Sequence, residues 1–328
     1  MIIFIQEREV IMDIQILLWF QDFRNGVGSF LAPYFNWVTQ FSVSFWPIAM
    51  MCMLYWVLDR KNGKRILGGF GLGLLMNGFL KLIFCVYRPW IRDSRIEPYG
   101  DSKVAATGYS FPSGHTTFAT GAFGGVGYWM LKHKKKIITC VLWFLVISTM
   151  ISRNYLGVHT PQDVIVGFIS TSCMLFVANK VENWSDQDIN RDKIILIGGV
   201  LFCVALVCFY TFKSYPMTYL DDGSLLVDPV KMRADSFEGI GFISSFVICR
   251  YFERRGFDFE KINWKDRFIV GAFALIPLYF YCMYLIPCIM EINRFAGKYL
   301  MCAGIVVYTL IVVPNIMKYI NNKKMLES

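Results

Sequence analysis

Long apolar stretches alternate with short polar segments along most of the chain. A helix needs roughly 20 mostly apolar residues to cross a bilayer, and runs of about this length recur throughout the sequence. The pattern therefore predicts an all-α, polytopic membrane protein. We expect nine spans, the seventh being the shortest, over residues 35–58, 66–87, 112–131, 137–152, 161–179, 194–212, 237–251, 268–288 and 299–317.

The N-terminal pattern is different. Between residues 13 and 31, apolar residues such as Leu17, Phe20 and Phe23 lie on one helical face, but Asp22 interrupts the apolar run. Such a helix is typical of segments that lie on a membrane surface and do not cross it. We therefore expect an interfacial amphipathic helix ahead of the first span.

The chain contains no internal repeat and no low-complexity linker, so the spans are expected to form one membrane domain. Residues 1–5 are apolar but too short for a cleavable signal peptide, and Met12 is a candidate start of the natural chain. The expected organisation is an N-terminal segment with the amphipathic helix at 1–34, a six-helix core at 35–212, and an outer loop with about three further transmembrane helices at 213–328.

Composition supports a membrane protein. Of the 328 residues 55% are hydrophobic, and the mean hydropathy is +0.46, which is too apolar for an ordinary soluble domain. The net charge of +9 comes from Lys and Arg gathered in short loops between apolar runs, so we expect no nucleic-acid partner. The ten cysteines lie mostly inside apolar runs without metal-ligand spacing, and they are expected to be small buried residues.

Lys and Arg are unevenly divided between alternate loops. The richer set comprises the loops at 59–65, 132–136, 180–193 and 250–267, together with the C-terminus. Because basic loops stay in the cytoplasm, the N-terminus is expected outside and the C-terminus inside. Short loops without targeting signals favour a bacterial inner membrane.

Three polar clusters interrupt the apolar sequence, and all three fall on the predicted outer side. The clusters are Lys81–Pro89, Ser110–His115 and Ser152–Asp163. Each lies where a predicted span begins or ends, so four helix ends meet at one membrane face. Side chains from these clusters are therefore candidates for one shared site facing the periplasm or exterior.

The second cluster has the features of a helix start. Pro112 suits the first helical position, with Ser110 as a possible cap. The amides of Ser113 and Gly114 would then be unpaired donors, which is the arrangement that binds anions at helix N-termini. His115 would stand beside such an anion, whereas the alternative is a helix cap without a ligand.

The third cluster joins a histidine to a carboxylate. Thr160 can cap a helix and Asp163 can reach back to it, as in a capping box, and this alone would account for Asp163. His159 directly precedes the cap, however. A carboxylate near a histidine can accept its ring N–H and direct the opposite nitrogen outward as a nucleophile or base.

Three cations lie near the same outer face: Lys81, Arg88 and Arg153. A charge inside a membrane span is costly and usually functional, and arginine can hold phosphate oxygens with two N–H groups. The competing interpretation is contact with lipid headgroups, which we expect for rim residues such as Arg92 and Lys103. No paired carboxylates accompany the cations, so a metal-independent site without a cofactor is expected.

Taken in order, Lys81-x6-Arg88-Pro89, Pro112-Ser113-Gly114-His115 and Ser152-Arg153-x5-His159-x3-Asp163 resemble the three-part signature of the type-2 phosphatidic acid phosphatase superfamily. The resemblance covers residues 81–163 and implies a six-helix core at about 35–212. The three further spans and the outside N-terminus are similar to the glucose-6-phosphatase and sphingosine-1-phosphate phosphatase branches.

The resemblance implies a division of roles. His159 would attack phosphorus to form a phosphohistidine, Asp163 would orient His159, and His115 would protonate the leaving oxygen. The groups implied to hold the phosphate oxygens are Lys81, Arg88, Arg153, Ser113 and the Gly114 amide.

The predicted function is an integral-membrane, metal-independent phosphatase that hydrolyses a lipid-linked phosphate monoester or diphosphate at the outer face. A phosphotransferase and a sugar-phosphate phosphatase remain as alternatives. A non-catalytic lipid carrier would be expected to lack His115, His159 or Asp163, and all three are present. A vanadate haloperoxidase shares the phosphate pocket, but the polytopic chain argues against it. The expected partners are the lipid substrate and membrane lipids, and the sequence does not indicate an oligomeric state.

Overall fold

The computed structural model describes residues 2–106, 108–220, 222–256 and 262–327. Within these ranges the chain forms helices and no β-strand, apart from one isolated bridge between Tyr219 and Leu225. The all-α prediction is therefore confirmed. Together with the apolar spans described below, it makes the chain a polytopic membrane protein.

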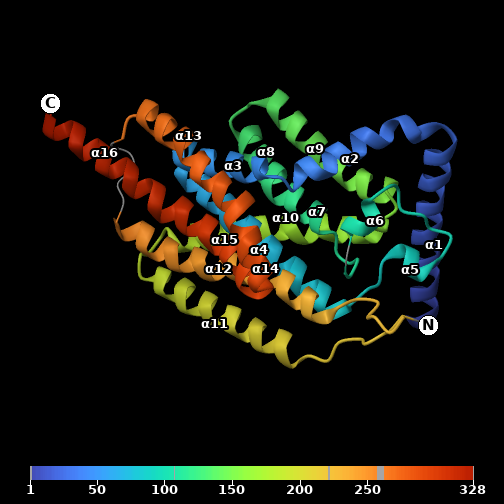
Figure 1. Ribbon diagram of the computed structural model, residues 1–328. Helices are drawn as coiled ribbons and strands as arrows, with labels where there is room; N and C mark the ends of the chain where they lie inside the picture. The colour runs from blue at the N-terminus through green and yellow to red at the C-terminus, as the bar shows by residue number, and fades with distance from the viewer. Residues whose placement is uncertain (1, 107, 221, 257–261, 328) are drawn as a thin grey trace.

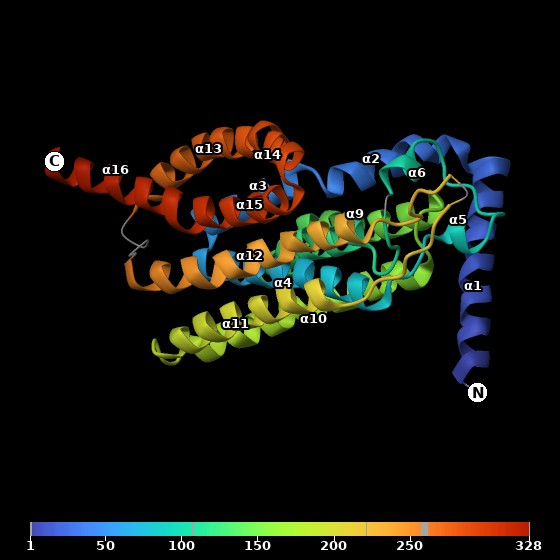
Figure 2. The same ribbon diagram turned by 60° about the horizontal axis from the view of Figure 1, so that its bottom comes forward.

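Five long helices run lengthwise through the molecule: α4 (Arg60–Phe84), α9 (Lys136–Tyr155), α10 (Pro161–Ser185), α11 (Arg191–Phe212) and α12 (Pro229–Gly256) (Figures 1 and 2). Helix α4 lies between α10 and α12 and packs along both. Close approach depends on small residues, because a Cβ on Gly71 of α4 would lie 2.2 Å from the Phe242 ring of α12. The centre of the bundle is thus built from the predicted core and from the C-terminal part of the chain.

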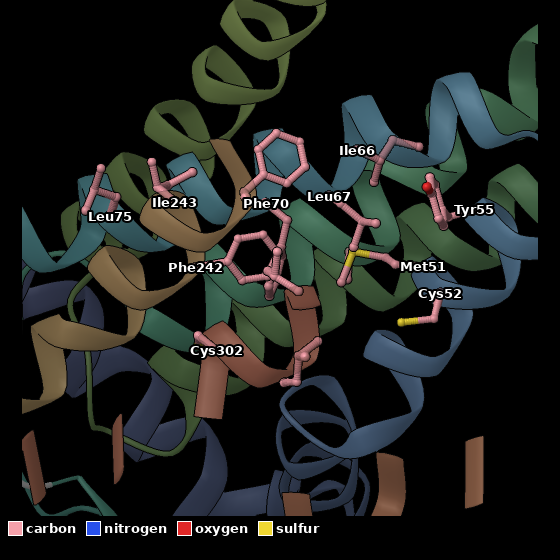
Figure 3. Packing of buried hydrophobic residues seen from close by; sticks show 14 of the residues in the cluster. Met51, Cys52, Tyr55, Ile66, Leu67, Phe70, Leu75, Phe242, Ile243 and Cys302 are labelled. Atoms are coloured by element: carbon pink, nitrogen blue, oxygen red, sulfur yellow. The ribbon is translucent and has the colours of Figure 1, made fainter. Parts of the chain in front are cut away.

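Buried apolar side chains fill the space between α4, α12 and their neighbours (Figure 3). The rings of Phe70 and Phe242 meet with centroids 5.6 Å apart. Burial of such side chains contributes roughly 1.5–3 kcal/mol each relative to exposure to water, but in lipid the gain comes from close packing. Leu67 and Ile243 belong to the same cluster, which fixes α12 against α4.

Two segments of the predicted core are interrupted helices. Residues 114–132 form α7 (Gly114–Ala119), a π-helical turn (Thr120–Gly124) and α8 (Gly125–Lys132). The first predicted span comprises α2 (Ala32–Ser42), α3 (Phe45–Met53) and a π-helical turn (Leu54–Leu58), with a bend of 48° between its halves. The bend lies where Ser44 caps α3 through the Trp46 amide.

The remaining C-terminal helices form a layer on α12. They are α13 (Trp264–Phe280), a π-helical turn (Tyr281–Leu285), α14 (Ile286–Ile292), α15 (Arg294–Val307), a second such turn (Tyr308–Val312) and α16 (Val313–Glu327). Helix α15 packs along α12, and α16 carries the C-terminus to the end of the molecule far from α1 (Figures 1 and 2).

The N-terminal helix α1 (Ile2–Phe23) crosses the end of the bundle, where the short helices α5 (Pro89–Arg92) and α6 (Ser102–Ala105) also lie (Figures 1 and 2). Its Leu17 is buried, whereas Trp19 is 61% exposed. Short turns follow α1 at Arg24–Gly28 and Ser29–Leu31. There Arg24 donates to the carbonyls of Tyr155 (3.0 Å) and Glu97 (2.8 Å). A transverse helix with exposed apolar residues fits the interfacial helix expected from the sequence, although it begins earlier than residue 13.

In the part of the chain that the structure describes, six helices are long and apolar enough to cross a membrane, or seven if the bent pair counts as one span. The other two predicted spans, 112–131 and 237–251, are helical but do not meet this test. The first is divided by its π-helical turn. The second is part of α12, whose polar residues such as Arg250 and Glu253 are buried among other helices, so it does not need an apolar surface toward lipid.

The two ends of the bundle differ in chemistry. At one end Lys61 and Arg65 of α4 pair with Asp186, directly after α10, and Arg254 of α12 joins them. Because α4 and α10 run antiparallel, the end of α4 and the start of α10 meet at the opposite end of the bundle, next to α1.

Candidate active site

Four helix ends converge at the end of the bundle that α1 crosses, as expected from the three polar clusters. Lys81 lies in the last turn of α4 and Arg153 in the last turn of α9. His115 lies in the first turn of α7, and Asp163 in the first turn of α10. Arg88, Ser113, Gly114 and His159 occupy the connections and starts between them. The structure thus gathers all eight predicted site residues at one end of the bundle.

The carboxylate of Asp163 is held by several donors. Its Oδ2 accepts hydrogen bonds from Ser110 Oγ (2.5 Å) and the Thr160 amide (2.8 Å), and lies 3.3 Å from His159 Nδ1. Asp163 and Thr160 also complete the capping box of α10. The helix cap and the histidine partner were alternative interpretations of Asp163, and in the structure one oxygen atom serves both.

The tautomer of His159 follows from its neighbours. Its Nε2 lies 3.0 Å from Arg88 Nη1, and since arginine can only donate, Nε2 must be the unprotonated acceptor. The ring proton is then on Nδ1, facing Asp163. Burial lowers the pKa of His159 well below its usual value, and the charges of Arg88, Arg153 and Lys81 lower that pKa further.

Arg88 and Arg153 are both buried at the site. The guanidinium of Arg88 is fixed by the Gly108 carbonyl at Nε and the Val158 carbonyl at Nη1, each at 3.0 Å. Arg153 donates from Nη1 to Thr39 Oγ1 at 2.9 Å, whereas its buried Nε has no hydrogen-bond partner among the described residues. A buried N–H without an acceptor is costly, and a phosphate oxygen would satisfy it.

Lys81 connects the first cluster to the second. Its Nζ donates to the carbonyls of Pro112 (2.7 Å), Tyr109 (3.2 Å) and Ser110 (3.4 Å). These acceptors account for its three N–H groups. Lys81 therefore fixes the loop ahead of α7 and adds positive charge to the site without a donor left over.

The start of α7 differs from the prediction in its cap, its first residue and one of its free amides. The N-cap is Ser113, whose hydroxyl accepts from the Thr116 amide; Ser110 is not the cap, and Pro112 lies outside the helix. Ser110 instead donates to Asp163, and a hydrogen bond to a charged carboxylate is stronger than one between neutral groups. The Ser113 amide, predicted to be unpaired, donates to the Asp163 carbonyl at 2.9 Å. The amides of Gly114 and His115 belong to the first turn, where a helix supplies no acceptor.

Four polar residues at the site were missed or misassigned from the sequence. Asn77 donates to the Pro112 carbonyl at 3.3 Å, and Asn154 donates to the His159 carbonyl at 2.8 Å. Both could have been found from the sequence. Asn77 precedes Lys81 by four residues and so shares its helix face, and Asn154 directly follows Arg153. Thr39 and the true role of Ser110 depend on tertiary contacts that no local pattern reveals.

The described residues contain no group of three or more His, Cys, Asp or Glu side chains arranged to hold a metal ion. The side chains that the described residues do gather at this site are Lys81, Arg88, Arg153, His115, Ser113 and the His159–Asp163 pair. Such a donor set suits an anion with several oxygens.

Comparison with known proteins points to the same part of the chain. Residues 62–186 match the model of the PAP2 superfamily. The chain is 34% identical to phosphatidylglycerophosphatase B of Bacillus subtilis over 111 residues, or 32% of this chain and 53% of that protein. It is 25% identical to undecaprenyl-diphosphatase of Sulfolobus acidocaldarius over 162 residues, which is 48% of this chain and 71% of that protein.

The chain thus spans about half the length of the Bacillus relative that it matches. No solved structure is significantly similar to it. The matched segment begins near the start of α4 and ends just after α10, so it contains all eight predicted site residues, from Lys81 to Asp163. The segment of the chain that builds this site is therefore the one that matches the PAP2 superfamily.

Proposed function

We propose that the protein is a membrane phosphatase that removes a phosphate group from a lipid through a covalent phosphohistidine. The observation that carries the proposal is the environment of His159. Its Nε2 is unprotonated and faces Arg88, and its Nδ1 faces Asp163. Such a nitrogen can act as a nucleophile once Arg88 donates to a phosphate oxygen of the substrate and releases the Nε2 lone pair.

In the first step, His159 Nε2 attacks phosphorus while the bond between phosphorus and the leaving oxygen breaks. Asp163 accepts the Nδ1 proton in a hydrogen bond and stabilises the positive charge that develops on the ring. His115 has to enter this step protonated; it gives its proton to the leaving oxygen, so the leaving group departs as an alcohol or as a protonated lipid phosphate.

In the second step, water attacks the phosphohistidine. His115, now neutral, takes a proton from the water, the bond between phosphorus and Nε2 breaks, and inorganic phosphate leaves. Arg88, Arg153, Ser113 and the first-turn amide of Gly114 would hold the phosphate oxygens in both steps. Lys81 would contribute charge through space, since carbonyl groups occupy its N–H donors.

The proposed substrate is a lipid-linked phosphate monoester or diphosphate. The relatives bear the names of enzymes for phosphatidylglycerophosphate and undecaprenyl diphosphate, which supports a lipid phosphate for this chain. Both molecules present a terminal phosphate next to a lipid anchor, which a site at the end of a membrane bundle can reach.

The proposed membrane placement puts the site outside. Loops rich in Lys and Arg gather at the opposite end of the bundle, and basic loops stay in the cytoplasm. We assign the protein to a bacterial inner membrane, with α1 on the outer surface. Residues 1–34, 35–212 and 213–328 remain the proposed N-terminal, core and C-terminal parts.

The test is phosphate release by the purified, detergent-solubilised protein in the presence of EDTA. The panel should contain lipid monophosphates, lipid diphosphates and sugar phosphates. We expect release from a lipid class by the wild type and by a His133→Ala control, whose histidine is exposed at the end of α8. A His159→Ala variant should be inactive. Turnover by that variant would refute the nucleophile, and no release from any lipid by the wild type would refute the phosphatase.

A further inference from the structure

A cavity of about 470 Å³ adjoins the site, between the loop that follows α4 and the start of α12. Arg88 forms part of its lining, and Lys103 comes from the same loop. Asp228 and Lys231 line it from the C-terminal part of the chain. The remaining lining residues are apolar side chains or glycine. The cavity therefore joins the segment matched by the PAP2 superfamily to a part of the chain outside that match.

The cavity is held in a fixed position relative to Arg88. Met232 of α12 accepts a hydrogen bond from the Tyr109 amide at its sulfur (3.4 Å), and a Cβ on Gly108 would lie 2.2 Å from that sulfur. The carbonyl of Gly108 in turn accepts from Arg88 Nε. Because Met232 of α12 packs on Gly108, whose carbonyl holds Arg88, the start of α12 is fixed close to the Arg88 guanidinium.

The charge of the cavity is positive. Among the residues that the structure describes, neither Lys103 nor Lys231 has an ion-pair partner. The one carboxylate in the lining, Asp228, is engaged by the Val230 amide at 2.8 Å. Apolar walls lower the local dielectric constant and strengthen the attraction between these ammonium groups and an anion. These features suit an anionic group that lies close to the phosphate group proposed to bind at Arg88.

We propose that the cavity binds a second phosphate group of the substrate, the one that stays on the leaving group, and that Lys103 and Lys231 hold it. The inference rests on the proposed phosphatase site, since Arg88 is shared by the two. It makes the preferred substrate a lipid with two phosphates, either adjacent as in a diphosphate or separated by a short spacer as in phosphatidylglycerol phosphate. A lipid monophosphate would leave the two lysines without a ligand group.

The experiment compares a Lys103→Gln/Lys231→Gln variant with the wild type on two substrate pairs. The pairs are phosphatidylglycerol phosphate with phosphatidate, and a polyprenyl diphosphate with its monophosphate. We expect the wild type to have the higher kcat/KM on the two-phosphate member of one pair. Loss of two charge-assisted contacts should reduce that preference by about tenfold to a hundredfold, and the pair that responds identifies the spacing of the phosphates.

The matched control is Lys213→Gln, because Lys213 also lies on this side of the bundle but contacts Cys85 and Tyr215 outside the cavity. It should retain the wild-type preference. An unchanged preference in the double variant, or a wild type without any preference, would overturn the proposal.

Measuring lipid binding tests the second phosphate site independently of the proposed phosphatase activity. In a His159→Ala background, which is expected not to turn over, the affinities for the same four lipids can be measured at equilibrium. A preference for two phosphates that disappears when both lysines are replaced would support the cavity even if the wild type released no phosphate. Equal affinities before and after replacement would refute it even if the wild type were an active phosphatase.

Discussion

At the scale of single residues, Ser110 is the side chain whose contribution the motif does not indicate. Its hydroxyl donates to the same Asp163 oxygen that faces His159. Ser110→Ala should lower kcat by about tenfold to a hundredfold, since a hydrogen bond to a charged group contributes roughly 1.5–3 kcal/mol. KM should change little, because Ser110 acts through Asp163 and not on the phosphate. Steady-state kinetics on the best lipid substrate would measure both.

The control for Ser110 is Ser148→Ala. Ser148 is also buried, but its hydroxyl accepts from Tyr34 and is not among the hydrogen-bond partners of the site. If both variants lost activity to the same degree, the effect would be loss of packing, and the positioning role of Ser110 would be wrong.

The pH dependence of the reaction should reflect the lowered pKa of His159. His159 must be neutral to act as the proposed nucleophile, and burial followed by the charge of Arg88 keeps its pKa well below the usual value of 6.5. As pH falls through 6.5, His159 therefore stays neutral, and kcat/KM should not decline on its account until a clearly lower pH. The profile should be measured on two substrates whose own phosphate groups titrate differently. A loss of activity centred near 6.5 for both would contradict this expectation.

Most of the candidate site residues could be predicted from the sequence because they stand close together in three short clusters. His159 and Asp163 are one helical turn apart, so their contact follows from local geometry. Arg88 and His159 are 71 positions apart, and their hydrogen bond depends on the packing of α10 against α4. The tautomer of His159 could therefore not be predicted from the sequence, although both residues were named.

At the scale of elements, α12 is joined to the predicted core by buried ion pairs. Arg250 contacts Glu182 at 2.5 Å and Asp192 at 2.7 Å. Arg250→Met should destabilise the protein by about 3–5 kcal/mol, because it leaves the carboxylate of Glu182 buried without its partner. The thermal unfolding temperature in detergent, followed by intrinsic fluorescence, should fall clearly.

Arg255→Met is the matched control on the same helix. Its side chain is 30% exposed and contacts Asp192 at 3.3 Å, where Arg250 and Arg254 remain. A partly exposed pair of this kind contributes about 1 kcal/mol or less. Equal shifts in the two variants would mean that the buried network does not hold α12 in place.

The same ion pairs explain which elements the sequence could and could not predict. A helix at 237–251 was predicted from its apolar residues, but the full length of α12 was not, because polar residues flank that run. One of them is Arg254, whose partner Asp192 is distant, since it precedes Arg254 by 62 positions. The break in the first span did have a local signal, namely Ser44 as the cap of α3, and the apolar pattern concealed it.

At the scale of the whole molecule, the arrangement of charge predicts an orientation. The C-terminal helix α16 lies at the basic end, where Lys318 donates to the Gly256 carbonyl at the end of α12. The loop between α11 and α12 lies at the other end, beside the site, and its Gly223 is exposed. Because basic segments stay in the cytoplasm, these two positions should be on opposite sides of the membrane.

An epitope inserted after Gly223 should be accessible to antibody in intact spheroplasts of a bacterial host, whereas an epitope after Ser328 should become accessible only after lysis. Gly223 adopts a positive φ in a turn with open space around it, so an insertion there can be accommodated without disturbing packed helices. The reverse accessibility would place the site in the cytoplasm. The substrate would then have to reach it from the inner leaflet, and the positive-inside argument would fail for this protein.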